Sequence, residues 1–293
     1  MHADEVEVSD RLAAGLLSAQ LPQWAHLAQT LLHTGGSENT LIRLGKDLVM
    51  RFPRRAVAGA QVEVEAAWLH TLAPHLPLSV PLVLAEGKPG LGYPYPWLVL
   101  RWLPGENAQT APLADDLAAA RTLAGFVRAL HALPVPHALA RMTPDRHLRP
   151  RDGFTHQMIA LIVDEADPAL ATHYWEQALL LPEWRGAPVI VHADLHPLNL
   201  LTSDGEISAV IDWGGLCAGD PAHDLICAWM VLQSDGRALF RKLLQVDDQT
   251  WARARALAFS KALMAAPYYR VSNPPLHRMM CTALTRAMTD WPD

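Results

Sequence analysis

The amino-acid sequence predicts an α+β, bilobal protein in which a small lobe built on an antiparallel sheet precedes a larger, mainly helical lobe. Two observations lead to this prediction. The first hundred residues alternate short β-prone runs with turn-forming Gly and Pro residues, and only two stretches have helical spacing. From about residue 112 apolar residues recur at helical spacing, and one strand-like island interrupts them.

The small lobe is expected to contain an antiparallel sheet of five strands and one helix, preceded by a stretch with helical spacing. Residues 10–28 carry leucines at helical spacing until Pro22 breaks the pattern, and residues 61–72 return to that spacing. Short β-prone runs separated by turns predict the strands, at residues 31–34, 40–43, 48–52, 81–85 and 97–102. The first three runs indicate an antiparallel meander, so the order is β-β-β-α-β-β after the first helix.

The larger lobe is expected to be helical around an embedded hairpin. Its helices are predicted at residues 113–132, 164–181, 222–233 and from 237 to the C-terminus. Its strands are predicted at residues 189–192, 200–202 and 207–211. The Leu-Pro-Gly-Glu sequence that begins at Leu103 is a natural boundary between the lobes, which divides the chain into residues 1–103 and 104–293.

Composition and charge exclude several classes of protein. Of the 293 residues, 51% are hydrophobic and 18% charged, as in ordinary globular proteins. A net charge of −6 argues against nucleic-acid binding, which needs clustered Lys and Arg. The N-terminus lacks the order of a signal peptide, and no run of 18 apolar residues offers a membrane span. Three cysteines without a CxxC pair suit reduced thiols, so we expect a cytoplasmic protein with no membrane or obligate protein partner.

Three polar residues in the larger lobe stand where strands end. An apolar strand leads to Asp194 and Asn199, and a following hairpin delivers Asp212. Carboxylate and amide oxygens are the ligands that Mg²⁺ prefers. Phosphoryl transfer needs such a set, with one carboxylate to orient the attacking hydroxyl and an Asn and an Asp to hold metal against the phosphates.

Other interpretations of these residues are open. An Asp after a strand is often only a turn former or a helix cap, although three such residues in this order make that reading weaker. Alternatively, His192, Asp194 and His196 would form the transition-metal cluster of a metal-dependent hydrolase. That interpretation leaves Asn199 and Asp212 without a role, and no further histidine set completes it.

Three motifs occur in an order that a known family shares. They are His192-x-Asp194-x-x-x-x-Asn199, then Asp212-Trp213-Gly214, then Asp220-Pro221-x-x-Asp224. Together they resemble the aminoglycoside/macrolide phosphotransferase and choline-kinase-like family, relatives of the protein kinases. The resemblance covers nearly the whole chain and implies a protein-kinase-like fold, with residues 1–103 as the nucleotide-binding lobe and residues 104–293 as the catalytic and acceptor-binding lobe.

The resemblance also implies roles for the polar residues. Asp194 would be the catalytic carboxylate, and Asn199 and Asp212 would bind Mg²⁺, with ATP or GTP as the phosphoryl donor. His192 would brace the loop, and Asp224 would hydrogen-bond it from the next helix. A pseudokinase-like nucleotide-binding module is the alternative, which the intact polar residues disfavour.

The acceptor implied by the resemblance is the hydroxyl of a small molecule. An antibiotic, either an aminoglycoside or a macrolide, or a related amino alcohol or sugar would fit, so antibiotic resistance is the expected setting. Acidic residues near a helix start could line a pocket for a cationic acceptor: Asp164, Glu165 and Asp167. Acids in a first helical turn are common in any case.

The small lobe supplies the residues expected to hold the nucleotide. Gly36 and Ser37 lie in the Gly-rich turn that would cover the phosphates, although this turn is not G-x-G-x-x-G. Arg51 occupies the third-strand position where kinases have Lys, and Glu65 on the next helix is its expected partner. Backbone groups after the fifth strand would read the base edge, at Arg101 and Leu103.

Overall fold

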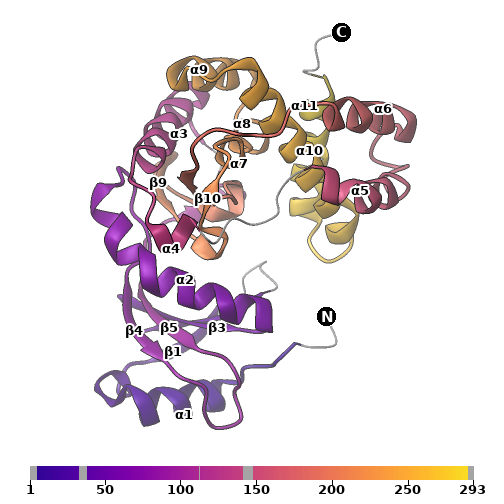
Figure 1. Ribbon diagram of the computed structural model, residues 1–293. Coiled ribbons are helices and arrows are strands. Elements are labelled where there is room, and N and C mark those ends of the chain that lie inside the picture. Colours follow the sequence, from indigo (N-terminus) through magenta and orange to yellow (C-terminus); the bar gives the residue numbers. More distant parts are fainter. Residues whose placement is uncertain (1–4, 33–37, 112, 141–147, 290–293) are drawn as a thin grey trace. The chain divides into compact units, whose positions relative to one another are not determined.

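The computed structural model describes residues 5–32, 38–111, 113–140 and 148–289 (Figure 1). The chain forms two compact units, residues 1–104 with 209–216 and residues 105–208 with 217–293. The first unit thus includes a short segment that begins with the last two residues of β9 (Glu206–Val210). The division of the chain into functional lobes at residues 103 and 104 stays a prediction.

The first unit contains the five-stranded antiparallel sheet that the sequence predicts. Its strands are β1 (Gln29–Leu32), β2 (Asn39–Leu44), β3 (Leu48–Pro53), β4 (Val83–Gly87) and β5 (Trp97–Arg101), in the order β1-β2-β3-β5-β4. All neighbouring strands pair antiparallel. Its helices are α1 (Asp10–Gln20) and α2 (Ala56–Leu72), which lie on opposite faces of the sheet (Figure 1).

Strand periodicity explains how this sheet divides its side chains. Successive residues of a strand point to opposite faces. Met50 and Phe52 of β3 therefore pack with the buried leucines of α1, and Val49 packs with Val62 of α2. Arg51 has the same parity as Val49 and so faces α2 instead of the apolar layer under α1.

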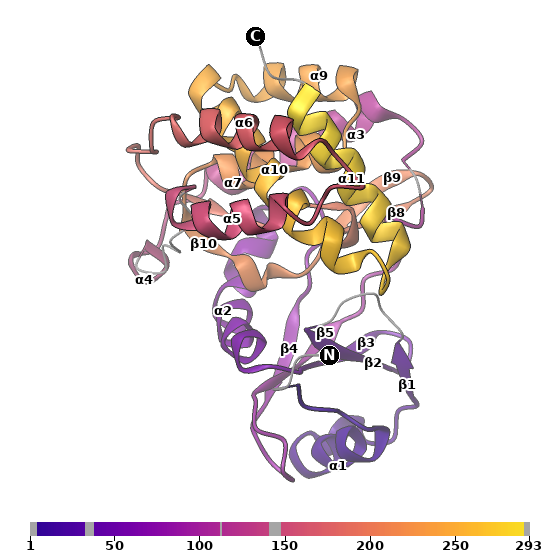
Figure 2. The same ribbon diagram turned by 90° about the vertical axis from the view of Figure 1, so that its right-hand side faces the viewer.

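The second unit is mainly helical. Its helices are α3 (Asp116–His131), α4 (His137–Ala140), α5 (Asp152–Ile159), α6 (Pro168–Leu179), α7 (Ala222–Leu225), α8 (Cys227–Met230), α9 (Ser234–Leu244), α10 (Asp248–Tyr269) and α11 (Pro274–Thr289). Helix α10 packs against α5, α6, α7, α8 and α11, so it forms the centre of this unit (Figure 2). Along the described part of the chain, no helix is long and apolar enough to cross a membrane.

Short strands in the second unit carry the polar loop. Strand β7 (Val189–Val191) pairs antiparallel with β10 (Cys217–Gly219), and β8 (Leu200–Ser203) lies between β6 (Glu106–Asn107) and β9. The loop between β7 and β8 carries Asp194 and Asn199. Both strands are largely buried, which fixes the two ends of the loop.

Several helix boundaries differ from those predicted. Helix α6 begins only at Pro168, because Asp167 caps it and accepts a hydrogen bond from Ala169 N–H at 2.8 Å. The helix expected at residues 222–233 is split into α7 and α8. Helices α4 and α5 were not predicted, since the Arg- and Pro-rich sequence before them hides their short apolar spacing.

Candidate active site

One predicted cluster forms within the first unit, around Arg51 of β3. The Arg51 guanidinium pairs with the Glu65 carboxylate on α2, and Nη2 lies 3.3 Å from Asp212 Oδ1. The side chains of Arg51 and Glu65 are 6% and 1% exposed, whereas that of Asp212 is 46% exposed. Arg51 therefore links a fully buried acid to an acid that solvent can reach.

The charge of Arg51 is fixed by its two partners. Burial alone would lower the pKa of Arg51, but the carboxylates of Glu65 and Asp212 outweigh it and raise that pKa above its ordinary value. The guanidinium therefore stays charged throughout the range in which proteins are folded. It can present its remaining N–H groups to an anion without a change of protonation.

Asp212 is held in an unusual backbone conformation. Its φ is 61° and its ψ is 70°, in the left-handed region that non-glycine residues rarely adopt. The next residue, Trp213, is buried and donates Nε1–H to the Val210 carbonyl at 3.0 Å. Gly214 follows because a Cβ there would come within 2.7 Å of the Gln61 side chain on α2. The Asp-Trp-Gly motif thus anchors this turn to α2 and turns the Asp212 carboxylate toward Arg51.

The second predicted cluster forms within the second unit, around Asp194. Asn199 donates Nδ2–H to the Asp194 carbonyl at 2.9 Å and to Asp194 Oδ2 at 3.1 Å. The Lys261 ammonium on α10 pairs with Asp194 Oδ1, and His196 Nε2 lies 3.5 Å from the same oxygen. The Asp194 side chain is 30% exposed although Oδ1 is buried, so Oδ2 is the carboxylate oxygen that a ligand can reach.

Buried side chains hold the Asp194 loop in place through hydrogen bonds to its backbone. The fully buried Asp224 of α7 accepts hydrogen bonds from His192 N–H at 3.2 Å and from Ala193 N–H at 2.7 Å. His131 of α3 donates Nε2–H to Asp224 at 2.9 Å. His192 is buried and its Nδ1 accepts from Asp194 N–H at 3.2 Å. His192 and Asp224 therefore support the loop, as the family resemblance implies.

These contacts compensate for local strain and for a buried charge. Ala193 has a φ of 65°, a left-handed conformation that is unusual for alanine and common near functional sites. Burial alone would raise the pKa of Asp224, but the hydrogen bond from His131 and the loop N–H groups lower it below its ordinary value. Asp224 therefore remains an anion that fixes the strained backbone beside Asp194.

The donor chemistry at Asn199 and Asp212 fits a hard divalent cation. Because Asn199 turns its Nδ2 toward Asp194, its Oδ1 is the amide atom left to ligate a metal. Asp212 contributes a half-exposed carboxylate. Both are oxygen donors, which suit Mg²⁺ better than softer metals.

The histidine-based alternative does not match the structure. His192 is fully buried and its Nδ1 is used by the backbone, and His196 Nδ1 accepts from Leu198 N–H at 3.3 Å. Among the described residues, no group of three or more His, Cys, Asp and Glu side chains is arranged to hold a metal ion. The sequence His192-x-Asp194-x-His196 therefore does not form the metal cluster of a hydrolase.

The remaining predicted nucleotide residues are placed only in part. Gly36 and Ser37 lie outside the described residues. Arg101 ends β5, and its N–H donates to the Leu82 carbonyl at 2.9 Å, so a base edge would have to meet its carbonyl instead. Leu103 also belongs to the first unit and lies close to its boundary, since the second unit begins at residue 105.

The acidic residues near α6 form contacts with other groups of the protein. Glu165 is 5% exposed and lies 2.7 Å from Arg270 Nη2, and Asp167 is the N-cap of α6. Asp164 lies 3.8 Å from Arg270 Nη1. Glu165 and Asp167 therefore do not offer free charges to a cationic acceptor, because Arg270 and the helix terminus use them, whereas the Asp164 side chain is 78% exposed.

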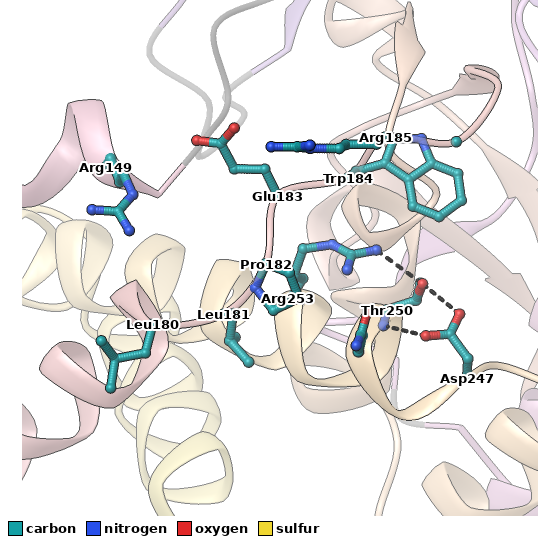
Figure 3. Close-up of a pocket in the computed structure, with 12 residues that line it drawn as sticks. Arg149, Leu180, Leu181, Pro182, Glu183, Trp184, Arg185, Asp247, Thr250 and Arg253 are labelled. Carbon is teal, nitrogen blue, oxygen red and sulfur yellow. Dashed lines mark hydrogen bonds between the residues drawn. The ribbon is translucent and has the colours of Figure 1, made fainter.

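A pocket of about 860 Å³ lies elsewhere in the second unit (Figure 3). Residues that follow α6 and the first turns of α10 line it, and Trp184 lies 5.3 Å under the Arg253 guanidinium. Arg253 also pairs with Asp220 of the third motif at 2.6 Å. None of the described residues predicted for the site lines this pocket, and Asp220 touches it only through its pairing with Arg253.

Lys261 and His131 are the two residues of the second cluster that the sequence analysis missed. Neither belongs to a motif. A signal exists for Lys261, which interrupts a run of buried positions on α10 that includes Phe259, Ala262 and Leu263. A charged residue on such a helix either reaches solvent or meets a partner. The sequence alone does not say which.

The geometry of both clusters matches the motifs, and comparison with known proteins gives the family. The sequence profile of the phosphotransferase enzyme family matches residues 6–257. The chain belongs to that family. The predictions of a phosphotransferase and of a protein-kinase-like fold are thereby confirmed, and the hydrolase alternative is wrong.

Similar proteins agree with this assignment. Viomycin phosphotransferase of Streptomyces vinaceus is 30% identical over 258 residues, which cover 81% of this chain and 85% of the relative. Aminoglycoside 3'-phosphotransferase of Escherichia coli is 28% identical over 207 residues, covering 68% and 74%. The GDP and kanamycin complex of APH(2")-IIia aligns over 95% of this chain and 98% of that chain, with a TM-score of 0.75 at 20% identity. These are phosphotransferases or share their fold.

Proposed function

We propose that this phosphotransferase moves the γ-phosphoryl group of ATP or GTP to a hydroxyl group of a small-molecule antibiotic, with Mg²⁺ as cofactor. One observation supports it most: a half-exposed carboxylate, Asp194, sits on a strained loop that a buried anion holds in place. The relatives named above act on an aminoglycoside or on viomycin by name, and a protein of similar fold was solved with GDP and kanamycin.

Arg51 is proposed to hold the phosphates of the nucleotide. Its charge is permanent and its position is fixed by Glu65, so it offers a rigid, preorganised cation. The backbone carbonyl of Arg101 and the N–H of Leu103 are proposed to meet the base edge, with Gly36 and Ser37 over the phosphates. Contacts of this kind are made in the ground state, and they lower the nucleotide KM more than they raise kcat.

Asn199 and Asp212 would hold Mg²⁺ through Oδ1 and the carboxylate. When bound, the ion neutralises charge on the phosphate oxygens. Arg51 restrains Asp212, and Asp194 restrains Asn199, so each proposed ligand has a second partner that orients it. A mixed carboxylate and amide set is expected to prefer Mg²⁺ over Zn²⁺.

Asp194 is proposed to orient the acceptor hydroxyl and to take its proton. Oδ1 is buried beside the Lys261 ammonium, so the hydroxyl proton would pass to Oδ2. In a loose transition state the carboxylate mainly positions the nucleophile and accepts the proton late. Such a general base typically contributes about 10²- to 10⁴-fold in rate.

A transfer assay tests the proposal. Labelled γ-phosphate from ATP and, separately, from GTP is supplied with kanamycin, viomycin or a macrolide, with Mg²⁺ or with EDTA. We expect a labelled acceptor with at least one donor, only with Mg²⁺, and labelling at least about 10²-fold slower with Asp194→Asn. Failure to label any acceptor, or transfer that persists in EDTA, would contradict the proposal. Stabilisation by nucleotide without any transfer would favour a binding module.

A further inference from the structure

The Asp194 carboxylate presents only one of its two oxygens to solvent. Oδ1 is buried, with the Lys261 ammonium against it and His196 Nε2 at 3.5 Å. The side chain as a whole is 30% exposed, so Oδ2 is the oxygen that an acceptor can reach. Oδ2 accepts a hydrogen bond from Asn199 at 3.1 Å and keeps a lone pair for a second donor. The group that holds Oδ1 therefore decides which oxygen reacts.

Lys261 lies outside the three motifs, on a helix that is held firmly. Its neighbours on α10, Ser260 and Ala262, are almost completely buried. Helix α10 also packs against α7 (Figure 2), whose Asp224 accepts hydrogen bonds from the backbone of the Asp194 loop. Two helices that pack against each other therefore hold both the backbone of this loop and its carboxylate.

The ammonium removes a freedom that the carboxylate would otherwise have. Asn199 donates its side-chain N–H to only one oxygen of Asp194, and the terminal torsion of an Asp side chain is broad. A general base must lie within hydrogen-bond reach of the hydroxyl, and a misplacement of about 1 Å can cost about 10²-fold in rate. An ion pair that borders solvent contributes little to stability, so the loss of Lys261 should change the rate more than the folding free energy.

We propose that Lys261 is a positioning residue of the transfer reaction, which holds Asp194 Oδ1 and thereby turns Oδ2 toward the acceptor hydroxyl. Because the carboxylate compensates its charge, Lys261 acts through Asp194 and not on the acceptor. The inference rests on the proposed role of Asp194. It has a specific consequence: the loss of Lys261 has no effect on the rate once Asp194 has lost its carboxylate.

NMR of the lysine ammonium groups tests the pairing without any substrate. The chain has four lysines, and all except Lys261 are exposed: Lys46, Lys88 and Lys242. We expect the ammonium protons of Lys261 to exchange with water more slowly than those of the exposed lysines, and to lose this protection in Asp194→Ala. Equal exchange at all four lysines of the native chain would overturn the inference.

Single-turnover transfer with matched variants tests the role in the reaction. Lys261→Met removes the charge and keeps the length of the side chain, Lys261→Arg keeps the charge, and Lys242→Met is the same change at an exposed lysine of α9. We expect Lys261→Met to be about 10- to 10²-fold slower with native nucleotide affinity and melting temperature. Lys261→Arg should regain part of the rate, and Lys242→Met should match the native chain. Adding Lys261→Met to Asp194→Asn should slow transfer no further.

Lys261→Ala gives a further readout, because a small amine can enter the space that the side chain leaves. Ethylamine should raise its rate of transfer in a saturable way, whereas tetramethylammonium, which has no N–H donor, should not. Additive effects of the Lys261 and Asp194 changes, or no rescue by either arginine or ethylamine, would overturn the inference. Absence of transfer by the native chain would overturn the proposed function instead, and the exchange of the Lys261 ammonium would still decide whether it holds the carboxylate.

Discussion

The cluster around Arg51 and the cluster around Asp194 both contain an ion pair, but they differ in burial. Arg51 and Glu65 are almost completely buried between β3 and α2. Asp194 and Lys261 are each about a third exposed. A buried pair is held in one arrangement by its own desolvation, since breaking it leaves a charge in an apolar medium. A pair that solvent can reach can exchange a partner for a ligand at small cost.

The difference in burial indicates that the two clusters have different functions. The Arg51 cluster is suited to hold a ligand that always carries the same charge, such as a phosphate chain. The Asp194 cluster is suited to rearrange when an acceptor arrives. Mutations of Arg51 and Glu65 should therefore affect stability together with nucleotide binding, whereas mutations of the partly exposed Asp194 and Lys261 should affect the reaction with little change in stability.

The largest effect on stability is expected from Arg51→Met. This change leaves Glu65 buried without its counter-charge, which should cost about 3–5 kcal/mol in the free energy of unfolding. Urea unfolding followed by circular dichroism measures this cost. The double variant Arg51→Met/Glu65→Leu is the control and should recover much of the loss. A loss below about 1 kcal/mol in the single variant would show that the pair is not fixed as described.

A smaller effect is expected from Asp224→Asn, and it should depend on pH. The variant keeps the shape but replaces a charged acceptor of the His192 and Ala193 N–H groups by a neutral one, at a cost of about 1–3 kcal/mol at neutral pH. Folding lowers the pKa of Asp224. The Asp224 carboxylate therefore contributes its full stabilisation when the pH is above its pKa in the unfolded chain. This stabilisation is lost as the pH falls through the pKa in the folded protein.

The test measures the free energy of unfolding of the native chain and of Asp224→Asn from neutral pH to below about pH 4. The difference in the free energy of unfolding between the native chain and Asp224→Asn should become smaller as the solution becomes acidic. A gap that stays constant or widens in acid would contradict an ionised Asp224. His131→Gln serves as a comparison, because it removes a donor to Asp224 and leaves the carboxylate in place.

The smallest effect is expected at a residue outside both clusters. Asp247 caps α10 and accepts a hydrogen bond from Thr250 N–H at 2.9 Å. Asp247→Ala should cost about 1 kcal/mol in stability and leave the rate of transfer unchanged. Thermal melts and the transfer assay check this together. A clear fall in rate would mean that the N-terminal end of α10 is coupled to the Asp194 loop.

The sequence predicted the first cluster more completely than the second. Strand alternation puts Arg51 on the face opposite Met50 and Phe52, and the helix that follows brings Glu65 to it. Arg51 and Glu65 are close in the chain, and the family resemblance named both, whereas the contact of Arg51 with the distant Asp212 was not predicted. The five antiparallel strands were predicted from β-prone runs and turns.

The second cluster depends on contacts between residues that are far apart in the sequence. The motif gave Asp194 and Asn199, but Lys261 and His131 reach them from α10 and α3. No spacing connects these residues, and only the packing of the helices brings them together. The partner of Glu165, Arg270, was missed for the same reason, so Glu165 was wrongly expected to face an open pocket.

The most direct test of the whole account measures transfer and nucleotide binding side by side for Asp194→Asn and the native chain. The account predicts that Asp194→Asn keeps the melting temperature and the nucleotide affinity of the native chain in the presence of Mg²⁺. It predicts at the same time that single-turnover transfer falls by about 10²- to 10⁴-fold, because the variant keeps the shape and loses the proton acceptor. Transfer by Asp194→Asn at close to the native rate, on an acceptor that the native chain uses well, would contradict it.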